Sequence, residues 1–212
     1  QWEADGSEPG FEIGKTAQFM EVHSDDDGQT WSPPRNLTRM VKRESWVLLA
    51  PSPQQGIALQ DGTLVMPIQG RDEDGAFASL LLSDDHGENW RVSSRAYSGG
   101  NECQAAELGD GSLMLNIRND NQKRRAVVVT KDKGKTWTTH ATHERDLVEP
   151  TCNGSLYRWA SRSNPSPPAL LLFCNPQSER ERINMTIQVS TDDGLTWPKE
   201  RALLLDEGKG FG

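Results

Sequence analysis

The chain has 212 residues, of which 34% are hydrophobic and 25% are charged, and its formal net charge is −8. This acidic balance disfavours a nucleic-acid partner, and no apolar run approaches the roughly 20 residues that span a membrane. The three cysteines and four histidines show no zinc-ligand spacing, so the sequence predicts neither a bound metal nor another cofactor.

Four copies of one polar sequence recur along the chain, and we call them Asp boxes. They read SDDDGQTW, SDDHGENW, TKDKGKTW and STDDGLTW, at residues 24–31, 83–90, 130–137 and 190–197. In each box the Ser or Thr and the central Asp can bond backbone amides, the glycine can adopt a positive φ, and the tryptophan can fold back over the loop. The boxes therefore predict tight hairpin turns. They start 47 to 60 residues apart, an interval that suits the four-stranded blades of a propeller.

A second hairpin signal lies between the boxes. GIALQDGTLVMPIQ at 56–69 and CQAAELGDGSLMLNIR at 103–118 both place an Asp-Gly turn between alternating apolar and polar residues. Each blade is then predicted to run strand A, Asp-Gly turn, strand B, strand C, Asp box, strand D. The two ends of the strands form two rims of the propeller, and this order puts the boxes on the same rim as the Asp-Gly turns. The opposite rim receives the start of A, the end of B and the start of C.

Two charged residues are predicted to meet on that opposite rim. A two-residue turn at 110–111 places Cys103 opposite Arg118 and Glu102 opposite Asn119. Glu102 and Arg118 are therefore expected to be near neighbours at the open end of one hairpin.

Two more side chains are expected on the same rim. Arg182 precedes the fourth Asp box by eight residues, at the start of a C strand, and Gln69 occupies the position equivalent to Arg118 one blade earlier. A carboxylate and two guanidinium groups around one rim favour an anionic ligand, because guanidinium donates paired hydrogen bonds to a carboxylate. By position alone, ordinary inter-strand ion pairs explain the same residues equally well.

The Asp boxes, together with NECQAAELGDGSLMLNIRND, RINMTIQVSTDDGLTW and LLLDEGKGFG, resemble bacterial exo-α-sialidases (neuraminidases) with a six-bladed propeller. The resemblance covers nearly the whole chain. It implies an all-β fold in which residues 1–212 form a partial propeller domain of about four blades.

The resemblance also implies roles for the rim residues. Arg118 and Arg182 match the second and third members of an arginine triad that binds the sialic acid carboxylate. Glu102 matches the glutamate that activates a nucleophilic tyrosine, and Gln69 is assigned by its position to the glycerol or N-acyl pocket. A neutral phenol suits this substrate, because an anionic nucleophile would be repelled by the carboxylate on the anomeric carbon.

Other members of the family's site have no match in the sequence. The nucleophilic tyrosine would follow GKGFG, and the general-acid aspartate and the first arginine would precede Gln1. The two tyrosines present, Tyr97 and Tyr157, are predicted to be packing residues. The chain is thus interpreted as an internal piece that is inactive alone.

The resulting functional hypothesis is an exo-α-sialidase that hydrolyses terminal sialic acid from glycoconjugates with retention. Its partners would be sialylated glycans or glycoproteins, and the resemblance implies a secreted or periplasmic location. Two alternatives stay open: a non-catalytic propeller fragment that binds sialoglycans, and a trans-sialidase. The sequence does not determine oligomeric state or linkage preference.

Overall fold

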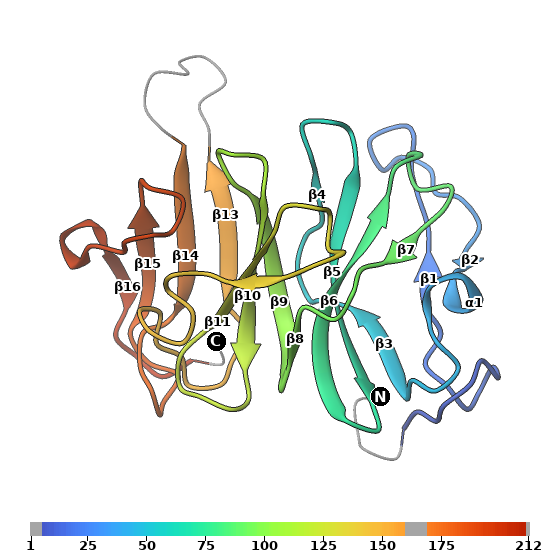
Figure 1. Ribbon diagram of the computed structural model, residues 1–212, viewed down its shortest axis with the longest axis horizontal. Coiled ribbons are helices and arrows are strands. Elements are labelled where there is room, and N and C mark those ends of the chain that lie inside the picture. Colours follow the sequence, from blue (N-terminus) through green and yellow to red (C-terminus); the bar gives the residue numbers. More distant parts are fainter. Residues whose placement is uncertain (1–5, 160–168, 211–212) are drawn as a thin grey trace.

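The computed structural model describes residues 6–159 and 169–210. Their strands form four antiparallel sheets that follow one another in chain order along the long axis (Figure 1). The described helices are two single turns, α1 (Thr38–Val41) and η1 (Lys199–Arg201), so nothing helical in these ranges could cross a lipid bilayer. The all-β propeller fold expected from the sequence is confirmed.

The third sheet shows the predicted blade most completely. Its strands are β9 (Gly100–Glu107), β10 (Leu113–Asn119), β11 (Ala126–Thr130) and β12 (Thr138–Thr139). They lie in the order β12-β11-β10-β9, with the Asp-Gly turn joining β9 to β10 and the third Asp box joining β11 to β12. The predicted order of strands A to D is therefore correct.

The other three sheets are variations on this blade. The fourth contains β13 (Ser155–Trp159), β14 (Leu170–Pro176), β15 (Met185–Ser190) and β16 (Leu203–Asp206). The second contains β3 (Leu48–Pro51), β4 (Ile57–Ala58), β5 (Leu64–Asp72), β6 (Gly75–Ser83), β7 (Arg91–Val92) and β8 (Tyr97–Ser98). The first has two described strands, β1 (Met20–Glu21) and β2 (Arg35–Asn36). The first Asp box joins these two strands as the third box joins β11 to β12.

The β9–β10 turn is one residue longer than predicted. The Leu108 N–H donates to the Ser112 carbonyl at 2.8 Å, and the Gly111 N–H donates to the Leu108 carbonyl at 3.0 Å. Three residues, 109–111, therefore form the loop, and Gly111 has a φ of +79° that favours glycine. The longer loop shifts the register by one. Ile117, and not Arg118, stands opposite Cys103, so the predicted cross-strand pairs are wrong.

Each Asp box is held by the same four hydrogen bonds. In the third box, Thr130 Oγ1 donates to Asp132 Oδ1 at 2.8 Å and accepts from the Gly134 N–H at 2.9 Å. Asp132 also accepts from the Thr136 N–H at 2.9 Å and from the Thr136 hydroxyl at 2.6 Å. Equivalent bonds close the other boxes, with an Asn side-chain amide as the last donor in the second.

The box tryptophans fold back over their own glycines, as predicted. A Cβ added to each box glycine would meet the indole ring three residues later at 3.4 to 3.8 Å. Trp90, Trp137 and Trp197 also pack against the hydrophobic clusters between sheets. Trp31, in the two-stranded first sheet, is instead 62% exposed.

Contacts between blades confirm that the boxes share a rim with the Asp-Gly turns. Lys133 of the third box donates to Thr63 at 2.6 Å and pairs with Asp61 at 2.8 Å, and both partners belong to the Asp-Gly turn of the preceding sheet. Asp193 of the fourth box accepts from the Gly109 N–H at 3.0 Å. The boxes thus join neighbouring blades as well as closing their own hairpins.

The core consists of apolar clusters between successive sheets. Leu113, Leu115 and Ile117 of β10 face the second sheet, whereas Met114 faces the fourth. This alternation follows the period of a strand, and both faces are buried because a blade stands on each side. The opposite rim is left free for polar side chains.

The Asp boxes should contribute stability that depends on pH. Hydrogen bonds from the Thr136 hydroxyl and N–H, and from Thr130, lower the pKa of Asp132 to about 2. An unfolded aspartate has a pKa of about 3.9, so the stabilisation is present above that pH and is lost as pH falls toward about 2. We expect Asp132→Asn to unfold at a lower temperature than the wild type at pH 6, with a smaller gap at pH 3. Thermal unfolding of both proteins at the two pH values checks this, and an equal gap would contradict it.

Candidate active site

The rim opposite the boxes carries a β-bulge at the end of the β9–β10 hairpin. Ile117 pairs with Cys103 but Asn119 pairs with Gly100, so two residues of β9, Asn101 and Glu102, stand opposite Arg118. Bulges redirect side chains and are frequent next to active sites. Here the bulge presents Glu102 and Arg118 together.

Glu102 and Arg118 form an ion pair, as the hairpin predicted despite its wrong register. Arg118 Nη1 lies 2.8 Å from Glu102 Oε2, and the two side chains are 24% and 23% exposed. Burial opposes the charged form of Arg118, but the hydrogen bond that Arg118 donates to Glu102 and the charges of Glu102, Asp120 and Glu149 outweigh it and raise the pKa of Arg118. The guanidinium therefore stays charged on this rim.

Arg118 keeps donor capacity for a further acceptor. Its Nε is buried and makes no hydrogen bond within the described residues, and the nearest carboxylate oxygen in ion-pair range, Asp120 Oδ1, is 3.9 Å away. Buried donors are normally satisfied, so this nitrogen is an exception, and a ligand would instead reach the exposed part of the Arg118 side chain, which is 24% exposed.

Arg182 lies in the loop between β14 and β15, three residues before the strand that was predicted to contain it. Its carbonyl accepts from the Gly210 N–H at 2.8 Å. Burial, and to a lesser extent the negative charge of Glu149, raises the pKa of the Cys152 thiol. The positive charges of Arg182, Arg125 and Arg118 oppose this rise. The charges of Arg118 and Arg182 therefore both act on the Cys152 thiol.

Gln69 lies on β5, between Ala50 and Ala78 of the neighbouring strands. Its side-chain amide contacts the Pro51 carbonyl at 3.5 Å. The carbonyl of Ile68, the residue before Gln69, accepts a hydrogen bond of 3.5 Å from the thiol of Cys103, the residue after Glu102. Gln69 and Glu102 are therefore each next in sequence to a residue of this contact, which joins two blades.

Beneath this rim lies a buried polar network that the sequence analysis missed. Arg125 Nη1 lies 2.8 Å from Glu149 Oε2, and both side chains are 0% exposed. Arg125 also donates to Asn116 Oδ1 at 2.7 Å and to the Cys152 carbonyl at 2.9 Å. The available signal was an asparagine, Asn116, between the apolar residues Leu115 and Ile117. A buried amide of this kind requires partners.

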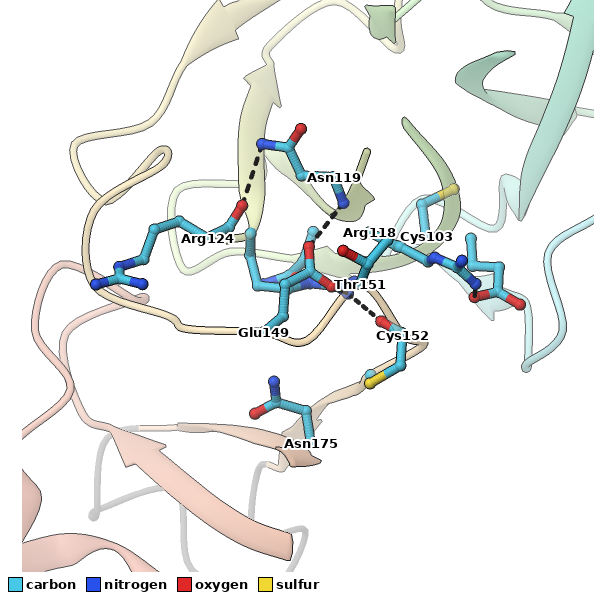
Figure 2. Close-up of polar contacts among 12 residues, drawn as sticks. Cys103, Arg118, Asn119, Arg124, Glu149, Thr151, Cys152 and Asn175 are labelled. Carbon is cyan, nitrogen blue, oxygen red and sulfur yellow. Dashed lines mark hydrogen bonds and ion pairs between the residues drawn. The ribbon is translucent and has the colours of Figure 1, made fainter. Parts of the chain in front are cut away.

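Asn119 connects the network to the rim. Its backbone N–H donates to Glu149 Oε1 at 2.7 Å, and its side-chain amide donates to the Arg124 carbonyl at 3.1 Å. Figure 2 shows Asn119 joined to both residues, with Arg118, Glu149 and Cys152 gathered around the same point. The residue after Arg118 is thus fixed from two sides.

Neither tyrosine takes part in the Glu102–Arg118 pair. The Tyr97 hydroxyl donates to Glu144 Oε1 at 2.7 Å, and burial, aided by Glu144, raises the pKa of Tyr97. Tyr97 packs against a core cluster as predicted, but Tyr157 is 50% exposed, so its prediction as a packing residue is wrong.

The arrangement is suited to an anion. It combines two guanidinium groups whose charges both act on the Cys152 thiol with a partly exposed carboxylate that is held against one of them. A carboxylate ligand could bind the arginines, and Glu102 could accept a proton from a nearby hydroxyl.

Comparisons with known proteins agree with the fold. The chain is 43% identical over 207 residues to a sialidase of Bacteroides fragilis, covering 97% of this chain and 38% of that protein. It is 34% identical over 187 residues to a sialidase of Micromonospora viridifaciens, covering 82% of this chain and 28% of that protein. The solved structure of Hadza microbial sialidase Hz136 superposes with a TM-score of 0.91 at 46% identity, over 96% of this chain and 40% of that one.

The chain spans well under half the length of these relatives. Residues 6–212 match the family described as BNR repeat-like domain, which accounts for nearly all of the sequence. The chain therefore belongs to the BNR repeat-like domain family.

Proposed function

We propose that this chain contributes the central part of the active site of an exo-α-sialidase, a glycoside hydrolase that releases terminal sialic acid. The observation that carries the proposal is the Glu102–Arg118 pair, presented by a bulge on the rim opposite the Asp boxes. The charge of Arg182, which acts on the same Cys152 thiol as that of Arg118, and the named sialidase relatives support it.

In this proposal Arg118 and Arg182 bind the sugar carboxylate. The Arg118 side chain is 24% exposed and its guanidinium carries five N–H donors, so carboxylate binding need not break its ion pair with Glu102. Gln69, on the neighbouring blade, contacts the glycerol or N-acyl substituent.

Glu102 acts as the base toward a tyrosine nucleophile supplied from outside the described residues. As the phenol attacks the anomeric carbon, Glu102 takes its proton, and the phenolate oxygen forms a bond to the sugar while the aglycone leaves with a proton from a separate acid. Water then cleaves the tyrosyl intermediate, so the anomeric configuration is retained. The ion pair with Arg118 holds the Glu102 carboxylate in place on the rim.

The natural partners would be sialylated glycans or glycoproteins, and the protein would act after export from the cytoplasm. The test is incubation of the complete protein with a fluorogenic sialoside, followed by product analysis. Release of fluorophore together with free sialic acid is expected. Binding without turnover would instead favour a sialoglycan-binding protein, and sialic acid recovered on an acceptor sugar would favour a trans-sialidase.

A further inference from the structure

The end of β10 depends on a side chain for its backbone pairing. β11 begins at Ala126, opposite Ile117, so beyond Ile117 strand β10 has no strand partner on that side. Asn119 is fully buried, and its N–H donates to the Glu149 carboxylate at 2.7 Å. A buried N–H without an acceptor is costly, and a charged acceptor makes the stronger bond. Glu149 thus replaces the missing strand at the residue that follows Arg118.

Arg125 holds the Glu149 carboxylate in place. The guanidinium bonds Glu149 Oε2, Asn116 Oδ1 of β10 and the Cys152 carbonyl, and so joins three separate segments. The segment it fixes includes Thr151, which has a left-handed φ of +55°. A non-glycine residue keeps such a conformation only where its surroundings enforce it.

A fully buried ion pair contributes little net stability to a core. Apolar side chains of similar volume often give equal or greater stability, because both charges must be removed from water. The pair does, however, fix geometry. One carboxylate oxygen sets the position of the backbone beside Arg118, and the other is neutralised by Arg125. Arg118 therefore remains directed toward Glu102.

We infer that the buried Glu149–Arg125 pair positions Arg118 to bind the carboxylate of the substrate. This inference rests on the proposed function, because it concerns recognition at the same site. Glu149 touches no substrate atom and acts through the backbone of Asn119.

The test compares two ligands, sialic acid and its methyl ester, which differ in the charge that Arg118 recognises. Binding of each is measured on the complete protein by calorimetry. Wild type is expected to bind the acid at least about tenfold more tightly than the ester. Arg125→Met combined with Glu149→Met removes the pair without leaving an unpaired charge. It is expected to lose most of this preference while ester affinity changes by less than about twofold.

A matched variant separates positioning from simple loss of packing. Arg125→Met with Glu149→Gln keeps an acceptor oxygen for the Asn119 N–H, so it is expected to regain most of the preference for the acid. The control is Arg145→Met with Asp146→Met, which removes a surface ion pair whose Nη2 and Oδ2 atoms are 2.8 Å apart. This variant is expected to keep the wild-type preference for the acid. If the double methionine variant does not fold, Glu149→Asp, which draws the carboxylate back by one methylene, is measured in its place with the same expectation.

Equal weakening of both ligands, or an unchanged preference for the acid, would overturn the positioning role. A wild-type protein that binds neither ligand would instead overturn the proposed function, and this inference with it.

Discussion

Replacing Arg118 by alanine is expected to lower kcat/KM for a sialoside by about 30-fold or more. The lost charge-assisted contact with the substrate carboxylate corresponds to at least about 2 kcal/mol of transition-state stabilisation. The substitution also removes the ion pair that holds the Glu102 side chain in place. Steady-state kinetics of the complete protein on a fluorogenic sialoside measure the effect.

The control for this substitution is Arg91→Ala. Arg91 is a partly exposed arginine beside the second Asp box, where it pairs with Asp84 at 3.5 Å on the opposite rim. Its removal is expected to leave kcat/KM within about twofold of wild type, because an exposed ion pair contributes little. Comparable losses in the two variants would mean that Arg118 acts through stability and not through the substrate.

Replacing Arg125 alone by methionine is expected to lower the free energy of unfolding by about 3–5 kcal/mol. Glu149 would then be a fully buried carboxylate without its cation, and removing one partner of a buried pair is strongly destabilising. Urea unfolding, followed by tryptophan fluorescence, measures the change. Adding Glu149→Met to the same protein is expected to recover much of the loss. A single substitution that costs less than about 1 kcal/mol would show that the pair is not a closed structural unit.

The repeats made most of the fold predictable. A local motif such as the Asp box carries its own structure, because its Ser or Thr, Asp and Gly satisfy the turn from within. The alternation of apolar and polar residues around Asp110-Gly111 likewise predicted the β9–β10 hairpin. Since turn type and strand order set the position of each rim, the meeting of Glu102 and Arg118 could also be predicted.

The register and the bulge could not be predicted in the same way. Asp-Gly suits both two-residue and three-residue loops, and Gly111 with a positive φ fits either. The predicted pairing was therefore one residue out. The bulge at Asn101 and Glu102 then restored the contact that the incorrect register had suggested.

The Glu149–Arg125 pair was beyond sequence reasoning for a different reason. The two residues are 24 apart and belong to segments with no recognisable motif, and in the sequence they resemble ordinary surface charges. An antiparallel bridge between Arg124 and Val148, with backbone hydrogen bonds from Arg125 to Leu147 and from Glu149 to Lys123, brings them together. The roles of Glu102, Arg118 and Arg182 came from the family resemblance, because position alone fitted structural ion pairs equally well.

The central claim is that Arg118 and Arg182 bind one carboxylate beside Glu102. The most direct measurement is a crystal structure of the complete protein with bound sialic acid. Carboxylate oxygens are expected within about 3 Å of both guanidinium groups, with the anomeric carbon facing the Glu102 side. Sialic acid bound elsewhere, or a carboxylate held without Arg118 and Arg182, would contradict it.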